Sequence, residues 1–141
     1  MTPDLTEQVL HQLNQLRRLE RRNAPAIDPL HGQGYVLYHL CHRGAPAQPG
    51  ELCAELGITT PRMTSILSAL ERQGLLKRTV STTDRRRVIV TLTDDGRTLV
   101  QDHDAQQLER ISSLLDLLGE EDAKACTRIL DKVLLFEQSI R

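Results

Sequence analysis

The stretch over residues 76–96 constrains the fold more than any other part of the chain. Residues 88–92 form a β-branched run that is suited to a strand, and residues 81–84 before it are typical of a turn. Basic residues lie on both sides of that turn: Lys77, Arg78, Arg85, Arg86 and Arg87. The stretch therefore predicts a β-hairpin with a basic tip, and Thr93 predicts the start of a further helix directly after it.

The segment over residues 50–76, just before this hairpin, has the pattern of two short helices joined across a turn. Gly57 permits a tight turn, Thr59 or Thr60 is suited to cap the second helix, and Pro61 fits its first turn. Apolar residues recur at helical spacing on the inner face of this second helix: Met63, Ile66, Leu67 and Leu70. A helix-turn-helix followed by a basic hairpin predicts a winged helix.

The other face of the second helix is predicted to be a short polar surface near the helix N-terminus. Its members are Thr60, Arg62, Thr64, Ser65 and Ser68. Such a helix suits the DNA major groove, where side chains near the N-terminal end meet the base edges. Arg62 is the best candidate for a base contact because a guanidinium donates two parallel hydrogen bonds to guanine. In the hairpin, Arg86 is suited to the minor groove, and Arg78, Arg85 and Arg87 to phosphates.

The spacing of the hairpin residues resembles that of the multiple antibiotic resistance regulator (MarR) family of winged-helix transcription factors. The matching residues are Arg78, Asp84, Arg85, Arg86, Val90, Leu92, Thr93 and Gly96. The resemblance implies that Asp84 braces Arg86. The sequence departs from the family at Ser65, where many relatives carry Arg or Lys. It also departs at Gly32 and Gly34, which weaken the start of a second helix expected near Asp28.

The resemblance also implies the whole architecture, which is mainly α with a small β-hairpin wing. Residues 1–141 form a single MarR-type domain in this interpretation, with dimerisation helices over 1–27 and 97–141 and the winged helix over 28–96. Pro25 and Pro29 separate the first helix from the second. Two chains would form a homodimer and place their recognition helices on half-sites about one helical turn, ~34 Å, apart on a near-palindromic operator.

The resemblance also implies that a small, aromatic or anionic effector regulates the protein by binding between the dimer helices and the winged domain. Candidate lining residues are Arg17, Tyr35, Tyr38 and His39. The expected function is therefore a repressor that a small molecule releases from DNA. One alternative is a thiol-based redox-sensing regulator that uses Cys41, Cys53 or Cys126, although all three lie in apolar patterns. Another is a winged-helix module that binds proteins instead of DNA.

Enzymatic function has little support, because the sequence has no phosphate-binding glycine loop and no His-Glu-x-x-His pair. His39, Cys41 and His42 are close together, but one helical face presents only two of them, so neither a metal site nor a cofactor is expected. A small redox-active or metal-dependent enzyme stays as the alternative from this class.

Charge is unevenly distributed along the chain, although 18 Lys and Arg nearly balance 19 Asp and Glu. Residues 46–93 carry 7 basic and 4 acidic residues, whereas residues 94–141 carry 6 basic and 11 acidic residues. A basic centre is suited to face DNA while the acidic region faces away. No leader-like or long apolar segment occurs, so a cytoplasmic protein with reduced cysteines and no membrane association is expected.

Overall fold

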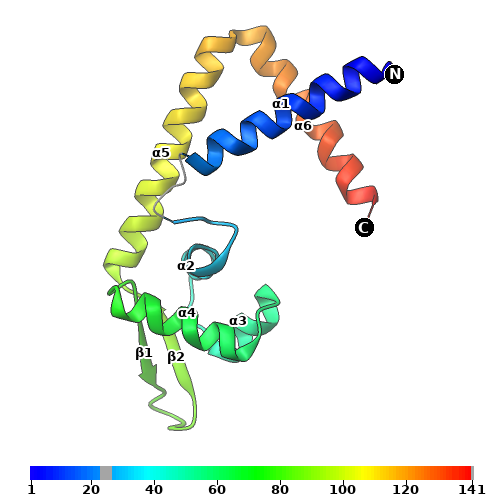
Figure 1. Cartoon of the computed structure of the whole chain (residues 1–141). Coiled ribbons are helices and arrows are strands. Elements are labelled where there is room, and N and C mark those ends of the chain that lie inside the picture. Colours follow the sequence, from blue (N-terminus) through cyan, green and yellow to red (C-terminus); the bar gives the residue numbers. More distant parts are fainter. Residues whose placement is uncertain (23–26, 141) are drawn as a thin grey trace. The chain divides into compact units, whose positions relative to one another are not determined.

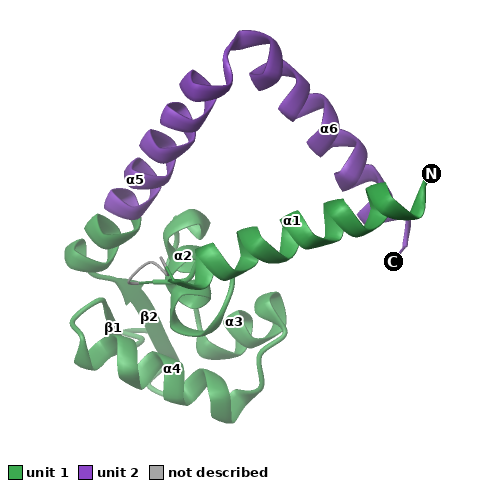
Figure 2. Ribbon diagram, turned by 45° about the horizontal axis from the view of Figure 1, so that its top comes forward, with its two compact units in different colours: residues 1–100 green, residues 101–141 purple. Residues whose placement is uncertain are grey.

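A computed structural model describes residues 1–22 and 27–140, so Pro25 lies outside the described residues. The order is α1 (Pro3–Arg22), α2 (Gly32–Arg43), α3 (Pro49–Leu56), α4 (Thr60–Arg72), β1 (Leu76–Val80), β2 (Val88–Leu92), α5 (Asp94–Leu118) and α6 (Glu120–Ser139) (Figure 1). The prediction of a mainly α fold with one small hairpin is confirmed. Residues 1–100 and 101–141 form two compact units, coloured separately in Figure 2.

The core of the first unit lies where α2, α3, α4 and the hairpin meet. Leu37 of α2, Leu52 of α3 and Leu67 of α4 are at most 1% exposed. Burying a leucine side chain contributes roughly 1.5–3 kcal/mol, so this small set fixes how the three helices pack. The four residues predicted for the inner face of α4, Met63, Ile66, Leu67 and Leu70, are all buried.

The helix-turn-helix forms as the sequence predicts. Gly57 ends α3 with φ +64°, a left-handed conformation that glycine adopts without steric cost. Thr59 is the N-cap of α4, and its carbonyl accepts a hydrogen bond from the backbone N–H of Met63 at 2.9 Å, while its side chain makes no capping bond. Pro61 lies in the first turn, where its missing N–H costs nothing.

The hairpin is an antiparallel pair in which Leu76 lies opposite Leu92 and Val80 lies opposite Val88. Its other edge is extended by a feature that the sequence did not reveal. Ala47, in the connector between α2 and α3, exchanges two backbone hydrogen bonds with Val90, at 3.0 and 2.7 Å. The base of the wing is therefore attached to the segment that leads into the helix-turn-helix.

Helix α2 begins at Gly32, four residues after the expected start at Asp28. The Asp28 carboxylate instead accepts hydrogen bonds from the backbone N–H of Leu30 at 2.9 Å and pairs with Nδ1 of His31 at 2.8 Å. These bonds lower the pKa of Asp28, with the Leu30 bond as the larger cause. A short acidic side chain that hydrogen-bonds its own following backbone favours a turn, which delays the helix.

The start of α5 packs directly against the turn before β1. Thr93 donates from its hydroxyl to the carbonyl of Gly74 at 2.6 Å, and the same hydroxyl oxygen accepts the backbone N–H of Gly96 at 3.1 Å. Its own backbone N–H donates to the carbonyl of Leu75 at 3.1 Å. Thr93 thus both caps α5 and joins it to the base of the wing, and the predicted helix start is confirmed.

Helix α1, helix α6 and the later turns of α5 expose much apolar surface. Neither α1 nor α6 has a buried residue. On α6 the side chains of Ile129, Val133, Phe136 and Ile140 are 60%, 49%, 63% and 62% exposed. Their spacing of 4, 3 and 4 residues places them on one face of the helix. An apolar stripe of this length favours burial against another polypeptide surface.

Candidate nucleic-acid interface

The N-terminal half of α4 presents the polar surface that the sequence predicted. Thr60, Arg62, Thr64 and Ser65 are exposed, and Ser68 is half-buried. Within the described ranges 1–22 and 27–140, Arg62 takes part in no ion pair. Its guanidinium is therefore available to an outside acceptor without first leaving a carboxylate.

Two of these side chains are hydrogen-bonded to the turn that precedes them. The hydroxyl of Thr64 donates to the carbonyl of Thr60 at 3.0 Å, and the hydroxyl of Ser65 donates to the carbonyl of Pro61 at 3.3 Å. Each hydroxyl keeps its oxygen as an acceptor, and its hydrogen can rotate to a new partner. Both groups are thus short, adaptable contacts beside the longer reach of Arg62.

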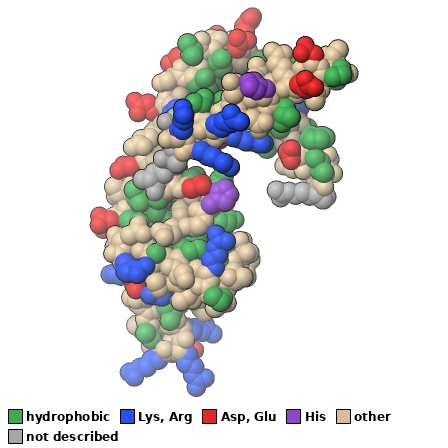
Figure 3. All heavy atoms as spheres, viewed as in Figure 1, with side chains coloured by type: hydrophobic (Ala, Val, Ile, Leu, Met, Phe, Trp, Pro, Cys, Tyr) green, Lys and Arg blue, Asp and Glu red, His purple; other side chains and the backbone are tan. Residues whose placement is uncertain are grey.

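The wing tip carries three exposed arginines, Arg85, Arg86 and Arg87. In Figure 3, which shares the view of Figure 1, Lys and Arg side chains project at the end of the hairpin. The turn is closed by two backbone hydrogen bonds, from Ser81 to the carbonyl of Arg87 at 2.9 Å and from Arg87 to the carbonyl of Asp84 at 3.0 Å. A hydrogen-bonded turn therefore fixes where the three charges leave the backbone.

Asp84 supports the tip in a different way from the expected one. Its Oδ1 accepts the backbone N–H of Arg86 at 3.0 Å, and its Oδ2 lies 3.5 Å from Nε of Arg87. Among the ion pairs of the described residues, the arginine beside Asp84 is thus Arg87, and Arg86 is held through its backbone. The Arg86 guanidinium forms no ion pair with the described residues, so it is available to an acceptor outside the protein.

Arg78, which the sequence assigned to phosphates, is engaged inside the unit. Its Nη2 donates to Oε1 of Glu71 at 3.0 Å and to Oγ of Ser68 at 3.3 Å, and its backbone N–H donates to Oε2 of Glu71 at 2.9 Å. The side-chain hydrogen bond from Arg78, followed by the backbone one, lowers the pKa of Glu71. The sequence analysis missed Glu71. Its carboxylate lies at the end of a helix, and which residue it meets beyond the following turn depends on the tertiary structure.

The four candidate effector residues come from α1 and α2 and differ in their exposure to solvent. Tyr38 is a core residue, 8% exposed, whose ring lies 5.8 Å from that of His42. Tyr35 is half-buried on the same helix, whereas Arg17 is exposed on α1. His39 pairs through Nε2 with the carboxylate of Glu55 on α3.

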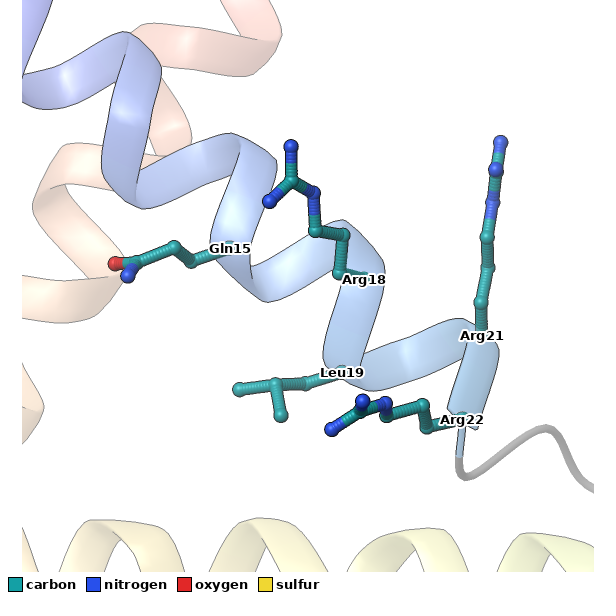
Figure 4. A pocket seen from close by; sticks show the side chains of 5 residues that line it. All are labelled: Gln15, Arg18, Leu19, Arg21 and Arg22. Carbon is teal, nitrogen blue, oxygen red and sulfur yellow. The ribbon is translucent and has the colours of Figure 1, made fainter.

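Two shallow, open depressions lie on α1 and are basic. One is lined by Asn14, Arg17, Arg18 and Arg21, and the other by Gln15, Arg18, Leu19, Arg21 and Arg22. In Figure 4, Arg18 and Arg21 extend to one side of the helix, away from Leu19 and Arg22. Side chains from one helix that point apart do not enclose a small molecule, which normally binds in a concave pocket.

A polar network joins α2 to α3, and the sequence analysis did not predict it. Arg43 contacts Glu51, lies 3.5 Å from Glu55, and donates to the carbonyl of Pro46 at 3.0 Å. The hydrogen bond from His39 is the largest cause of a lowered pKa at Glu55. This network orients the first helix of the helix-turn-helix relative to α2.

The next features bear on the cysteines, on metal binding and on membrane association. Cys41 and Cys53 pack against the core and Cys126 is half-buried on α6. Across residues 1–22 and 27–140, no group of three or more His, Cys, Asp or Glu side chains is placed to hold a metal ion. In the same residues, no helix has the length and apolar character needed to cross a membrane.

Comparison with known proteins identifies close counterparts of this arrangement. Residues 27–87 match the model of the MarR family. The chain is 30% identical over 99 residues to the HTH-type transcriptional regulator MhqR of Bacillus subtilis, over 70% of this chain and 67% of MhqR. The chain covers 60–67% of the length of the first three curated relatives it matches.

Two solved structures share the fold over nearly the whole chain. The YusO protein from Bacillus subtilis superposes with a TM-score of 0.72 at 26% identity, over 94% of this chain and 92% of YusO. A variant of MepR from Staphylococcus aureus, bound to an oligodeoxyribonucleotide, superposes with a TM-score of 0.64 at 26% identity. That alignment covers 100% of this chain and 99% of the MepR variant.

Proposed function

The chain belongs to the MarR family of HTH-type transcriptional regulators, which bind DNA and are not enzymes, and from this premise we propose how it binds its operator. Two copies form a homodimer in the cytoplasm, and each copy inserts α4 into the major groove of one half-site. The wing enters the adjacent minor groove through Arg86, while Arg85 and Arg87 contact phosphates. The observation that carries this proposal is the pairing of an exposed, polar α4 N-terminus with an unpaired arginine at the wing tip.

The dimer follows from the apolar faces of α1, α5 and α6. Residues 1–27 and 97–141 act as dimerisation helices in this proposal, and residues 28–96 act as the winged helix. Symmetry-related half-sites then lie about one helical turn, ~34 Å, apart on a near-palindromic operator. The basic winged region approaches DNA and the acidic C-terminal region points away, which favours one orientation on encounter.

Regulation in this proposal is the release of a repressor from DNA by a small aromatic or anionic molecule. Arg17, Tyr35 and His39 are the candidate contacts that keep a solvent-accessible part. His39 also joins α2 to Glu55 of the helix-turn-helix. A ligand that captured His39 would therefore disturb the position of α3.

Arg62→Ala tests the proposed base contact. We expect binding to the preferred operator to weaken by about 1–3 kcal/mol, with preference relaxed at one base pair in each half-site, because a bidentate contact to guanine is lost. Fluorescence anisotropy on operators with single base-pair changes measures both effects. Arg72→Ala is the control, since it removes an exposed arginine from the last turn of the same helix. Equal weakening by Arg62→Ala on every duplex would assign Arg62 to a phosphate.

Asp84→Ala tests how the wing tip is held. Removal of an acidic side chain beside phosphates favours tighter binding by simple electrostatics. We expect the opposite, about fivefold weaker binding, because the Arg86 backbone and the Arg87 side chain lose a hydrogen-bonding partner worth ~1 kcal/mol. Binding isotherms at several salt concentrations provide the measurement.

Asp95→Ala is the matched control for that experiment, because Asp95 is an exposed acid in the first turn of α5. Its removal changes the net charge equally and leaves the wing tip intact. Tighter binding by Asp84→Ala at every salt concentration would show that Asp84 does not support the wing.

A further inference from the structure

We propose that Glu71 and Arg78 form a pair that holds the wing at a fixed position relative to α4, and so determines which base pairs the wing reaches once α4 is in the major groove. Arg78 is in this view a positioning residue and does not contact a phosphate. The proposal rests on the DNA-binding function proposed above and adds a specificity-determining pair to it.

The pair joins the end of one element to the middle of the next. Glu71 lies in the last turn of α4, and Arg78 is the central residue of β1. One carboxylate oxygen of Glu71 accepts the backbone N–H of Arg78 at 2.9 Å, and the other accepts its Nη2 at 3.0 Å. Both the main chain and the side chain of the strand residue are thus fixed to the helix.

The hairpin register explains why the backbone N–H of Arg78 is available. Arg78 lies opposite Val90, and Val90 directs both its N–H and its carbonyl to Ala47. Such an arrangement marks a non-hydrogen-bonded pair in an antiparallel ladder, so the backbone groups of Arg78 also point away from β2. An outward N–H on an edge strand needs a partner, and Glu71 supplies it.

The Arg78 side chain is already bound to α4 through one guanidinium nitrogen. It is 30% exposed, and its Nη2 also donates to Ser68 on the preceding turn of α4. A phosphate contact through Nη2 would require the guanidinium to exchange a charged hydrogen bond to Glu71 for one to DNA. Arg85 and Arg86 face no such exchange, because no ion pair holds them in the described residues.

Backbone hydrogen bonds also fix the turn that joins α4 to β1. Between α4 and β1 the chain turns at Gly74, whose N–H donates to the carbonyl of Glu71, and the N–H of Leu75 donates to the carbonyl of Leu70. These bonds set the turn and not the direction of the strand beyond it. The Glu71–Arg78 pair reaches three residues further along the chain, to the middle of β1.

The experiment compares Glu71→Gln, Arg78→Gln and Arg78→Lys with the wild-type protein on one operator and on duplexes with single base-pair changes. Arg78→Lys keeps the charge but loses the planar fork of donors. Glu120→Gln is the matched control, because it removes a carboxylate paired with Lys124 within α6. Arg85→Ala is the reference for loss of a phosphate contact.

We expect all three variants to discriminate about tenfold less between duplexes that differ at the base pairs under the wing. Their discrimination at the base pairs under α4 should equal that of the wild type. Their slope of log K against log salt should match that of the wild type, whereas Arg85→Ala should reduce it by about 1. A general loss of stability would weaken binding to every duplex by the same factor and leave discrimination unchanged at both places, and that result would overturn the proposal. A slope reduced by about 1 in Arg78→Gln would overturn it too.

A second measurement needs no DNA and therefore separates this pair from the proposed function. NMR titration of the Glu71 carboxyl in the free protein should give a pKa below the ordinary range, and Arg78→Gln should raise it towards that range. An ordinary pKa in the wild-type protein would overturn the pair. If the wild-type protein bound no duplex while the depressed pKa was present, the proposed function would fail and the pair would remain only as a structural contact.

Discussion

Gly96→Ala is expected to destabilise the protein by about 3 kcal/mol. A Cβ atom at this position would lie 2.1 Å from the carbonyl oxygen of Leu75 and 2.9 Å from Cδ1 of Leu92. The first obstacle is backbone, which cannot rotate away, so α5 would have to shift from the base of the wing. Overpacking of this kind costs typically 1–3 kcal/mol, and occasionally more when backbone must move. Urea unfolding followed by circular dichroism measures the change.

The control for this prediction is Gly50→Ala. Gly50 lies in the first turn of α3, and a Cβ atom added there would meet nothing within 4 Å. Alanine favours helix over glycine by up to ~1 kcal/mol, so this variant should be as stable as the wild type or slightly more stable. Equal stabilities of the two variants would contradict the close approach of α5 to Leu75.

The sequence pattern identified Gly96 without its physical reason. A glycine three residues after Thr93 matches the spacing of the family. The structure adds the reason, which is that a glycine here lets α5 begin close to the Leu75 carbonyl. A helix start can be predicted from the sequence because the residues that determine it lie within one helical turn of each other. The start of α4 was predictable from Thr59 and Pro61 for the same reason.

Contacts between distant residues were not predictable. The pairing of Glu71 with Arg78 depends on the turn at Gly74 and on the hairpin register, and the pairing of Ala47 with Val90 depends on how the connector crosses the wing. The spacing identified Asp84, but it did not identify which arginine side chain lies beside it. The turn decides this, because it sets the direction in which each of the neighbouring arginines leaves the backbone. The effector residues share the same difficulty, and Tyr38 proved to be part of the core.

Val133→Asp is expected to dissociate the proposed homodimer. Val133 lies on the apolar face of α6 with Ile129 and Phe136, and an unpaired carboxylate buried there would cost at least ~2 kcal/mol per chain. With two copies per dimer, the dissociation constant should rise roughly a thousandfold. Sedimentation equilibrium over a range of protein concentrations measures it. The variant also leaves the winged helix unchanged, so half-site binding should persist weakly.

Gln138→Asp provides the control for the same helix. Gln138 follows Val133 by five residues and therefore lies on the opposite side of α6, on the same side as Asp131. The added charge is identical, and the dimer should keep its wild-type dissociation constant. A Val133→Asp protein that remained as dimeric as Gln138→Asp would remove α6 from the dimer interface.

Selection of duplexes from a randomised library by the wild-type protein tests the central claim most directly. A homodimer that reads DNA with two α4 helices and two wings should enrich an inverted repeat. Its half-sites should have centres about one helical turn, ~34 Å, apart, with A·T-rich sequence where each wing enters the minor groove. Enrichment of a single unrepeated half-site, or of no sequence above the starting library, would contradict this account.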